Sequence, residues 1–299
     1  MEKVMTAKIW ILAFSSAALA QQPVQPPSEA EARMLWDENF LRKRPPAKKT
    51  SRPAAQAISK APVTTPEQVV SDPAEDAFLG ITVWRLRPSR TADEPGVRIL
   101  VQKEGDDQEW TPERIEADHP LVEGQRVRMS IETARAGYLY VVDREQYADG
   151  TFSDPFLIFP TLKTRGGINQ VRAGALVEIP AWDDDPPYFR LRRRRADQVA
   201  ETLMILVTPQ PLSVPSLTHE ALKLSTEQVA GWERRWSAAV KRLEARDKLG
   251  KPYTKAEKEA ANNSKLLLTQ DDPTPQTLYR VEAKAGDPLL VTVPLRIRK

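Results

Sequence analysis

The residues with the clearest potential for binding chemistry are arginines that follow one another closely. They are Arg190, Arg192, Arg193, Arg194 and Arg195. A guanidinium group matches the geometry of phosphate and carboxylate groups, so this run predicts contact with an anionic polymer or with a protein partner. The alternative is a solvated edge strand whose charges prevent pairing with another sheet.

Residues suited to catalysis or metal binding are scarce. The chain has two histidines, His119 and His219, and no cysteine, and it carries none of the common nucleophile, phosphate-loop, zinc-protease or calcium-loop motifs. Asp183 to Asp185 offer hard oxygen ligands, but three acids before two prolines are more typical of an exposed turn. We predict no catalytic residue, no cofactor and no metal site. A hydrolase acting on envelope polymers, whose groups converge only in the fold, remains the alternative.

Two tryptophans raise a further alternative. Trp232 and Trp236 are four residues apart, in phase with Val229, Val240 and Leu243. Such a pair could stack a sugar, which would make the chain a carbohydrate-binding module. Two tryptophans on the apolar side of an amphipathic helix more often pack onto a sheet, and we predict packing here.

The composition limits the kind of protein. The 26 prolines outnumber the 12 glycines, whereas average proteins contain roughly 5% proline and 7% glycine. This inversion disfavours glycine-rich phosphate loops and favours strands with stiff turns. The absence of cysteine excludes disulfides, and a formal charge of only +3 gives no indication of nucleic acid as a partner.

The N-terminal region predicts export. Residues 1–20 combine a basic start, a short apolar stretch and the small residues of a signal-peptidase site, so the mature protein is expected in the periplasm or outside the cell, without a transmembrane segment. Residues 21–76 are rich in proline and basic residues, which predicts a largely disordered linker with one short helix near Ser28. The oligomeric state is left open.

The folded part, residues 77–299, is expected to be mainly β. Period-2 alternation with short turns is typical of antiparallel strands, and about seven strands favour a β-sandwich, immunoglobulin-like or related. Two more strands are expected after Pro275. The predicted strands are Ile81–Arg87, Arg98–Gln102, Arg126–Glu132, Tyr138–Asp143, Phe156–Phe159, Leu176–Ile179, Leu203–Thr208, Thr277–Glu282 and Leu289–Arg298.

The period changes to that of a helix between residues 225 and 265. Ser225 and Thr254 each precede a Gln or Glu by three residues, which is the pattern of a capping box. The first helix is expected to continue through Leu243 and to end at Gly250. We therefore predict a two-helix hairpin inserted near the C-terminus of the sandwich.

The order of several short motifs resembles a known family. The motifs, which span about residues 78–212, are Gly80–Trp84, Gly124–Arg128, Gly137–Val142, Gly150, Leu157–Pro160, Asn169–Gly174, Ile179–Pro180, Glu201–Leu203 and Val207–Leu212. Together they are similar to the bacterial domain of unknown function 4384. This resemblance implies an extracytoplasmic β domain without catalytic residues. The function expected from the sequence is a non-enzymatic accessory or interaction domain of the bacterial envelope.

Overall fold

The computed structural model describes residues 34, 40–41, 44–46, 77–101, 108–263, 266–284 and 286–298. The expected signal peptide lies outside the described residues, and so does most of the expected linker. Within these limits, no helix combines the length and the apolar composition that crossing a membrane requires.

Sheet 1 forms one layer of the domain. Its order is β12-β13-β1-β3-β2, and β4 pairs with β1 and also with β8 and β9. The first half of the long strand β1 pairs with β13 and its second half with β3, always antiparallel. In the described part of the chain, the strands of this sheet are β1 (Ala77–Pro88), β2 (Ile99–Val101), β3 (Gln108–Ile115), β4 (Arg126–Thr133), β8 (Leu176–Ile179), β9 (Phe189–Arg190), β12 (Val240–Glu244) and β13 (Thr277–Val281).

Sheet 2 forms the other layer, with the order β11-β6-β5-β10-β14 and with β7 paired to β5. Its long central pair, β5 and β10, runs antiparallel with one irregularity after Gln198. The strands described for this sheet are β5 (Gly137–Tyr147), β6 (Phe156–Phe159), β7 (Gln170–Val171), β10 (Gln198–Thr208), β11 (Leu222–Lys223) and β14 (Leu289–Arg296).

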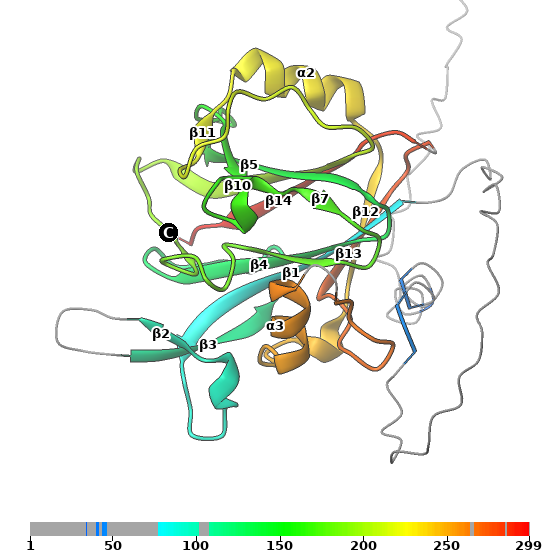
Figure 1. The fold of residues 1–299 in the computed structure, drawn as a ribbon. Helices are drawn as coiled ribbons and strands as arrows, with labels where there is room; N and C mark the ends of the chain where they lie inside the picture. The colour runs from blue at the N-terminus through cyan, green and yellow to red at the C-terminus, as the bar shows by residue number, and fades with distance from the viewer. Residues whose placement is uncertain are drawn as a thin grey trace, which may run out of the picture.

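The two sheets pack face to face and enclose the main hydrophobic core. In Figure 1, β1, β4 and β13 lie in the lower layer, and β5, β10 and β14 lie in the upper one. Alternate residues point into the core, as do Leu79, Ile81 and Val83 of β1, which are at most 1% exposed. Burying each such side chain contributes about 1.5–3 kcal/mol. The predicted antiparallel β-sandwich is confirmed.

The helix pair near the C-terminus is also confirmed, and its two members cover different sheets. Helix α2 (Thr226–Trp236) packs on the outer face of sheet 2, where Val229 meets Met204 and Leu206. Helix α3 (Lys255–Asn262) packs on the outer face of sheet 1. Both begin at the predicted caps. Between residues 77 and 298, the described residues also form the short 3-10 helices η2 (Pro95–Val97), η3 (Arg165–Gly167) and η4 (Arg246–Lys248).

The first helix is shorter than the sequence predicts. It ends at Trp236, and residues 240–244 form β12 at the edge of sheet 1. Pairing with β13 supplies this segment with ladder hydrogen bonds, and Leu243 becomes buried against Phe78 and Leu278. The tertiary environment therefore overrides a pattern that locally suits a helix.

Two residues within the range expected to be a linker are buried against sheet 1. Phe40 is 1% exposed and contacts Phe78 edge-on, with ring centroids 6.4 Å apart. The side chain of Arg44 is fully buried and forms a bidentate ion pair with Glu132: Nε donates to Oε1 at 3.0 Å and Nη2 donates to Oε2 at 2.7 Å. These residues of the N-terminal segment thus belong to the packed domain.

Candidate functional site

The predicted arginines lie at one end of the sandwich. Arg190 belongs to β9, which pairs with the start of β4, and the other four lie in the segment that leads into β10. Leu191 anchors this segment, because its side chain is 2% exposed. Its N–H donates to the carbonyl of Gln125 and its carbonyl accepts from the N–H of Gly124, each at 2.9 Å. The flanking guanidinium groups therefore extend from an anchored backbone.

Two of the five arginines neutralise acids of the domain itself. Nε of Arg194 lies 3.2 Å from Oε1 of Glu145. Arg195 donates to both carboxylate oxygens of Asp197, at 3.1 and 2.7 Å, and its guanidinium carbon lies 3.8 Å from the ring centroid of Tyr147. Although both side chains are largely exposed, these contacts leave them less available to a partner than the rest of the run.

The other three guanidinium groups have no acid partner in the described part of the chain. Nη2 of Arg193 instead donates to the backbone carbonyl of Arg298, at 3.0 Å. This contact brings the C-terminal end of the chain beside the run and adds two exposed arginines to it. We call the combined set the arginine surface: Arg190, Arg192, Arg193, Arg296 and Arg298.

Sequence reasoning missed the two C-terminal members of this surface. Their signal was present, because Arg296 and Arg298 alternate with the buried Leu295 and Ile297. Alternation predicts that both arginines face solvent. It does not predict that they reach the other run, because that depends on contacts of both segments with residues 121–125.

A second cluster, of carboxyl groups, lies at the same end. Asp143 and Glu145 of β5 continue the core-facing phase of Leu139 and Val141, and Glu145 stands directly opposite Glu201 of β10. Strand pairing thus brings three acids to the inner face of sheet 2. The sequence shows Asp143 and Glu145 as ordinary alternating residues, and only the register with β10 reveals the cluster.

Burial changes the proton affinity of two of these acids. Burial, reinforced by the charge of Glu145, raises the pKa of Asp143 to about 6. Burial and the charge of Asp143 raise the pKa of Glu201 to about 8. The carboxylate of Glu145 contacts Nε of Arg194 and accepts a hydrogen bond from the hydroxyl of Tyr147 at 3.0 Å. Asp143 and Glu201 therefore form a pair that retains a proton near neutral pH.

Hydrogen bonds connect this carboxyl pair to the arginine segment through Gln198. The backbone N–H of Arg194 donates to Oε1 of Gln198 at 2.8 Å. Nε2 of Gln198 in turn donates to Oε1 of Glu201 at 2.9 Å. Since Gln198 is only 2% exposed, it forms a fixed link between the acids inside and the arginines outside.

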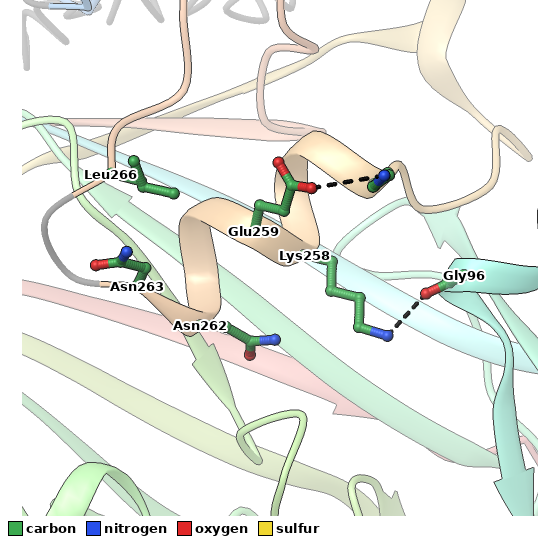
Figure 2. A pocket seen from close by; sticks show the side chains of 7 residues that line it. Gly96, Lys258, Glu259, Asn262, Asn263 and Leu266 are labelled. Atoms are coloured by element: carbon green, nitrogen blue, oxygen red, sulfur yellow. Dashed lines mark hydrogen bonds and ion pairs between the residues drawn. The ribbon is translucent and has the colours of Figure 1, made fainter.

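A cavity of about 390 Å³ lies elsewhere, beside α3 (Figure 2). Nζ of Lys258 donates to the carbonyl of Gly96 at 2.7 Å, and Glu259 pairs with Lys255 at 3.8 Å. Burial, with the nearby charge of Arg128, lowers the pKa of Lys258. Figure 2 shows the charged groups turned toward these partners and not converging on one point. The lining residues are Gly96, Lys255, Lys258, Glu259, Asn262, Asn263 and Leu266.

The other residues singled out from the sequence have structural contacts. Trp232 is 8% exposed and packs on sheet 2, as predicted, with the half-buried Trp236 stacked on it at 6.1 Å. Asp184 is buried and accepts hydrogen bonds from Thr164 Oγ1 at 2.6 Å and from Ala181 N at 2.8 Å. Among the described residues, no group of three or more His, Cys, Asp or Glu side chains is placed to hold a metal ion.

Comparison with known proteins adds no relative. Neither the family models, nor the curated proteins, nor the solved structures gave a match to this chain. The resemblance of residues 78–212 to the domain of unknown function 4384 therefore stays a prediction. The arginine surface and the carboxyl cluster beneath it are the features of the domain that bear on its function.

Proposed function

We propose that this chain is an exported, non-enzymatic binding domain of the bacterial envelope and that its arginine surface recognises an anionic partner. One observation carries the proposal. Five guanidinium groups from two distant segments share one end of the sandwich, and none forms an ion pair with an acid among the described residues; the positive charge of Arg296 acts on Asp118 only from a greater distance. A charged group that the domain leaves unpaired in this way is free to pair with a ligand.

The chemistry of the ligand follows from the chemistry of the surface. Guanidinium groups bind phosphate and carboxylate through paired N–H donors. Several such groups on one face suit a polymer that repeats the anion, such as an anionic envelope polymer, better than a single small molecule. The exported location is supported by the signal-like residues 1–20, and binding through exposed charges should weaken as salt increases.

A matched pair of variants tests the proposal with heparin as the anionic probe. Arg190→Ser/Arg192→Ser removes two charges from the arginine surface, whereas Arg234→Ser/Arg235→Ser removes two exposed charges from α2. We expect the first variant to bind heparin more weakly and with a flatter salt dependence, and the second to bind like the wild type. Equal binding by the two variants would show that only net charge matters, and the arginine surface would lose its assignment.

The alternative function is a hydrolase acting on envelope polymers. It is favoured by one observation, the neighbouring carboxyls of Asp143 and Glu201 with raised pKa values, because a protonated and an ionised acid together can serve as general acid and base. Release of soluble fragments from purified envelope polymers by the wild type, and its loss in Asp143→Asn, would establish this activity. No release from the polymers would eliminate it.

A further inference from the structure

We propose that the proton held between Asp143 and Glu201 regulates the anion affinity of the arginine surface. This inference rests on the proposed function and adds that anion binding by the same surface depends on pH. It is carried by three features of the geometry: the neighbouring positions of the two carboxyl groups on sheet 2, their hydrogen-bonded link to the arginine segment, and the position of Arg194 beside Glu145.

The proximity of the two carboxyl groups favours a proton on the pair. The register of β5 with β10 places Asp143 and Glu201 at neighbouring positions on the inner face of sheet 2, and two ionised carboxylates can only accept hydrogen bonds. Asp143 Oδ1 and Glu201 Oε2 are buried and accept nothing from any donor group in the described part of the chain. A shared proton satisfies both oxygens, whereas its loss leaves two adjacent buried negative charges.

The link to the arginine segment is short. Glu201 Oε1 accepts from Gln198, and Gln198 accepts from the backbone N–H of Arg194, so two hydrogen bonds separate the carboxyl pair from the arginine run. Arg194 also lies against Glu145, which stands opposite Glu201 in the sheet. A change of charge at the pair therefore acts on the segment that holds Arg192 and Arg193.

The groups that face Asp143 and Glu201 determine how a change in the charge of the pair affects the arginine segment. From β5 the pair faces Glu145, whose charge is already matched by Arg194 and whose other oxygen accepts from Tyr147. From β10 it faces Gln198, which is neutral, and β14 places the apolar Leu295 opposite Glu201. Arg194 is thus the cation that acts on both members of the pair.

The direction of the control follows from the sign of the charge. Below the pH at which the pair loses its proton, the pair carries one negative charge; above it, two. The second charge draws Arg194 inward and reduces the positive potential around the arginine surface, which weakens the binding of an anion. The pKa values are raised to about 6 for Asp143 and about 8 for Glu201. The pair therefore carries one negative charge between these two pH values, and it gains the second charge around pH 8.

The experiment measures the dissociation constant of a heparin oligosaccharide from about pH 5 to about pH 9 at constant ionic strength, a range in which sulfates and most carboxylates of the probe stay ionised. The proteins are the full chain, Glu201→Gln, Asp143→Asn and the control Glu259→Gln on α3. Gln and Asn keep the shape of the acids and cannot lose the proton. We expect the wild type and the control to bind about two- to fourfold more weakly at the high end, and both pair variants to show a flat profile.

The outcomes separate the two proposals. If all four proteins bind heparin with the same pH profile, a group other than the carboxyl pair sets that profile. The proposed regulation by the shared proton is then wrong, whereas the proposal that the arginine surface binds anions is unaffected. If the wild type shows no binding at any pH and the Arg190→Ser/Arg192→Ser variant behaves identically, both proposals fall. Regulation by the shared proton is supported if the dissociation constant is independent of pH in Glu201→Gln and Asp143→Asn but rises with pH in Glu259→Gln.

Discussion

At the scale of single residues, arginine serves two purposes in this domain. On the outer face of sheet 1, three fully buried arginines each pair with a buried glutamate, and two of them also stack on tryptophan rings, Trp84 and Trp182. Removing such charges from water is costly, so these pairs need good geometry and further hydrogen bonds. At the arginine surface the same residue type is exposed, or partly exposed in Arg193, and forms no ion pair with an acid of the described residues. The buried pairs are Arg44–Glu132, Arg114–Glu257 and Arg128–Glu178.

The raised pKa values of Asp143 and Glu201 make the stability of the domain depend on pH. A carboxyl whose pKa is raised to about 6 or about 8 holds a proton in the folded state that the unfolded chain releases. The contribution of such a carboxyl to the free energy of unfolding is therefore complete below about pH 4, and it is lost as the pH rises through the pKa of the carboxyl in the folded state. Glu244, with a pKa raised to about 7 by burial, acts in the same direction.

We expect the free energy of unfolding, measured with urea, to decrease between about pH 5 and about pH 9, and to decrease less in Glu201→Gln. The variant should also be more stable than the wild type at the alkaline end, because it buries no second charge. Glu259→Gln should follow the wild type. Parallel curves for Glu201→Gln and the wild type would mean that Glu201 is ionised throughout, and the shared proton would be disproved.

At the scale of elements, partners decide what the local pattern leaves open. The nine strands expected from alternation are all present, because their own residues show which face is buried. Strand β3 was missed because it contains Pro112, Glu113 and Arg114, which are unfavourable in a buried strand. The structure compensates these charges through Arg85 and through Glu257, the latter 143 positions away. No pattern within one segment can show such a compensation.

The same limit applies to the candidate site. The arginine run is visible in the sequence because its members are adjacent. The carboxyl cluster and the two C-terminal arginines come together only through the register of β5 with β10 and the position of β14. Gly137 shows the opposite case: the sequence suggests a strand entry where a side chain would clash, and a Cβ there would lie 2.6 Å from the carbonyl oxygen of Thr208.

Two glycines give opposite predictions for the same substitution. Gly137→Ala should lower the free energy of unfolding by about 1–3 kcal/mol, because backbone at the end of β10 must move to accept the methyl group. Gly231→Ala in α2 should raise it by about 0.5–1 kcal/mol, since nothing lies within 4 Å of the new Cβ and alanine favours the helix. Thermal and urea unfolding of the two variants check both signs. A stable Gly137→Ala protein would show that β5 and β10 separate easily at this point.

At the scale of the whole molecule, the outer layer over sheet 1 is assembled from both ends of the sequence. Arg44 uses all five of its N–H donors there: besides Glu132, it donates to the carbonyls of Thr269, Asp272 and Pro273 at 3.1–3.2 Å. Glu132 is 1% exposed, and burial raises its pKa against the opposing effect of Arg44. The sheet thus depends on a residue that precedes its first strand by more than thirty positions.

This dependence predicts that a chain starting at Ala77 is less stable than one starting at Met34. Losing Arg44 leaves Glu132 buried without its counter-charge, which typically costs about 3–5 kcal/mol, and losing Phe40 uncovers Phe78. Urea unfolding of the two chains gives the difference, and Arg44→Met in the longer chain should reproduce the part caused by the charge. In Arg44→Met/Glu132→Leu, where neither charge remains, most of the loss should be recovered. Equal stability of the two chains would instead place Phe40 and Arg44 outside the folding unit and restore the boundary near Phe78 that the proline-rich sequence suggests.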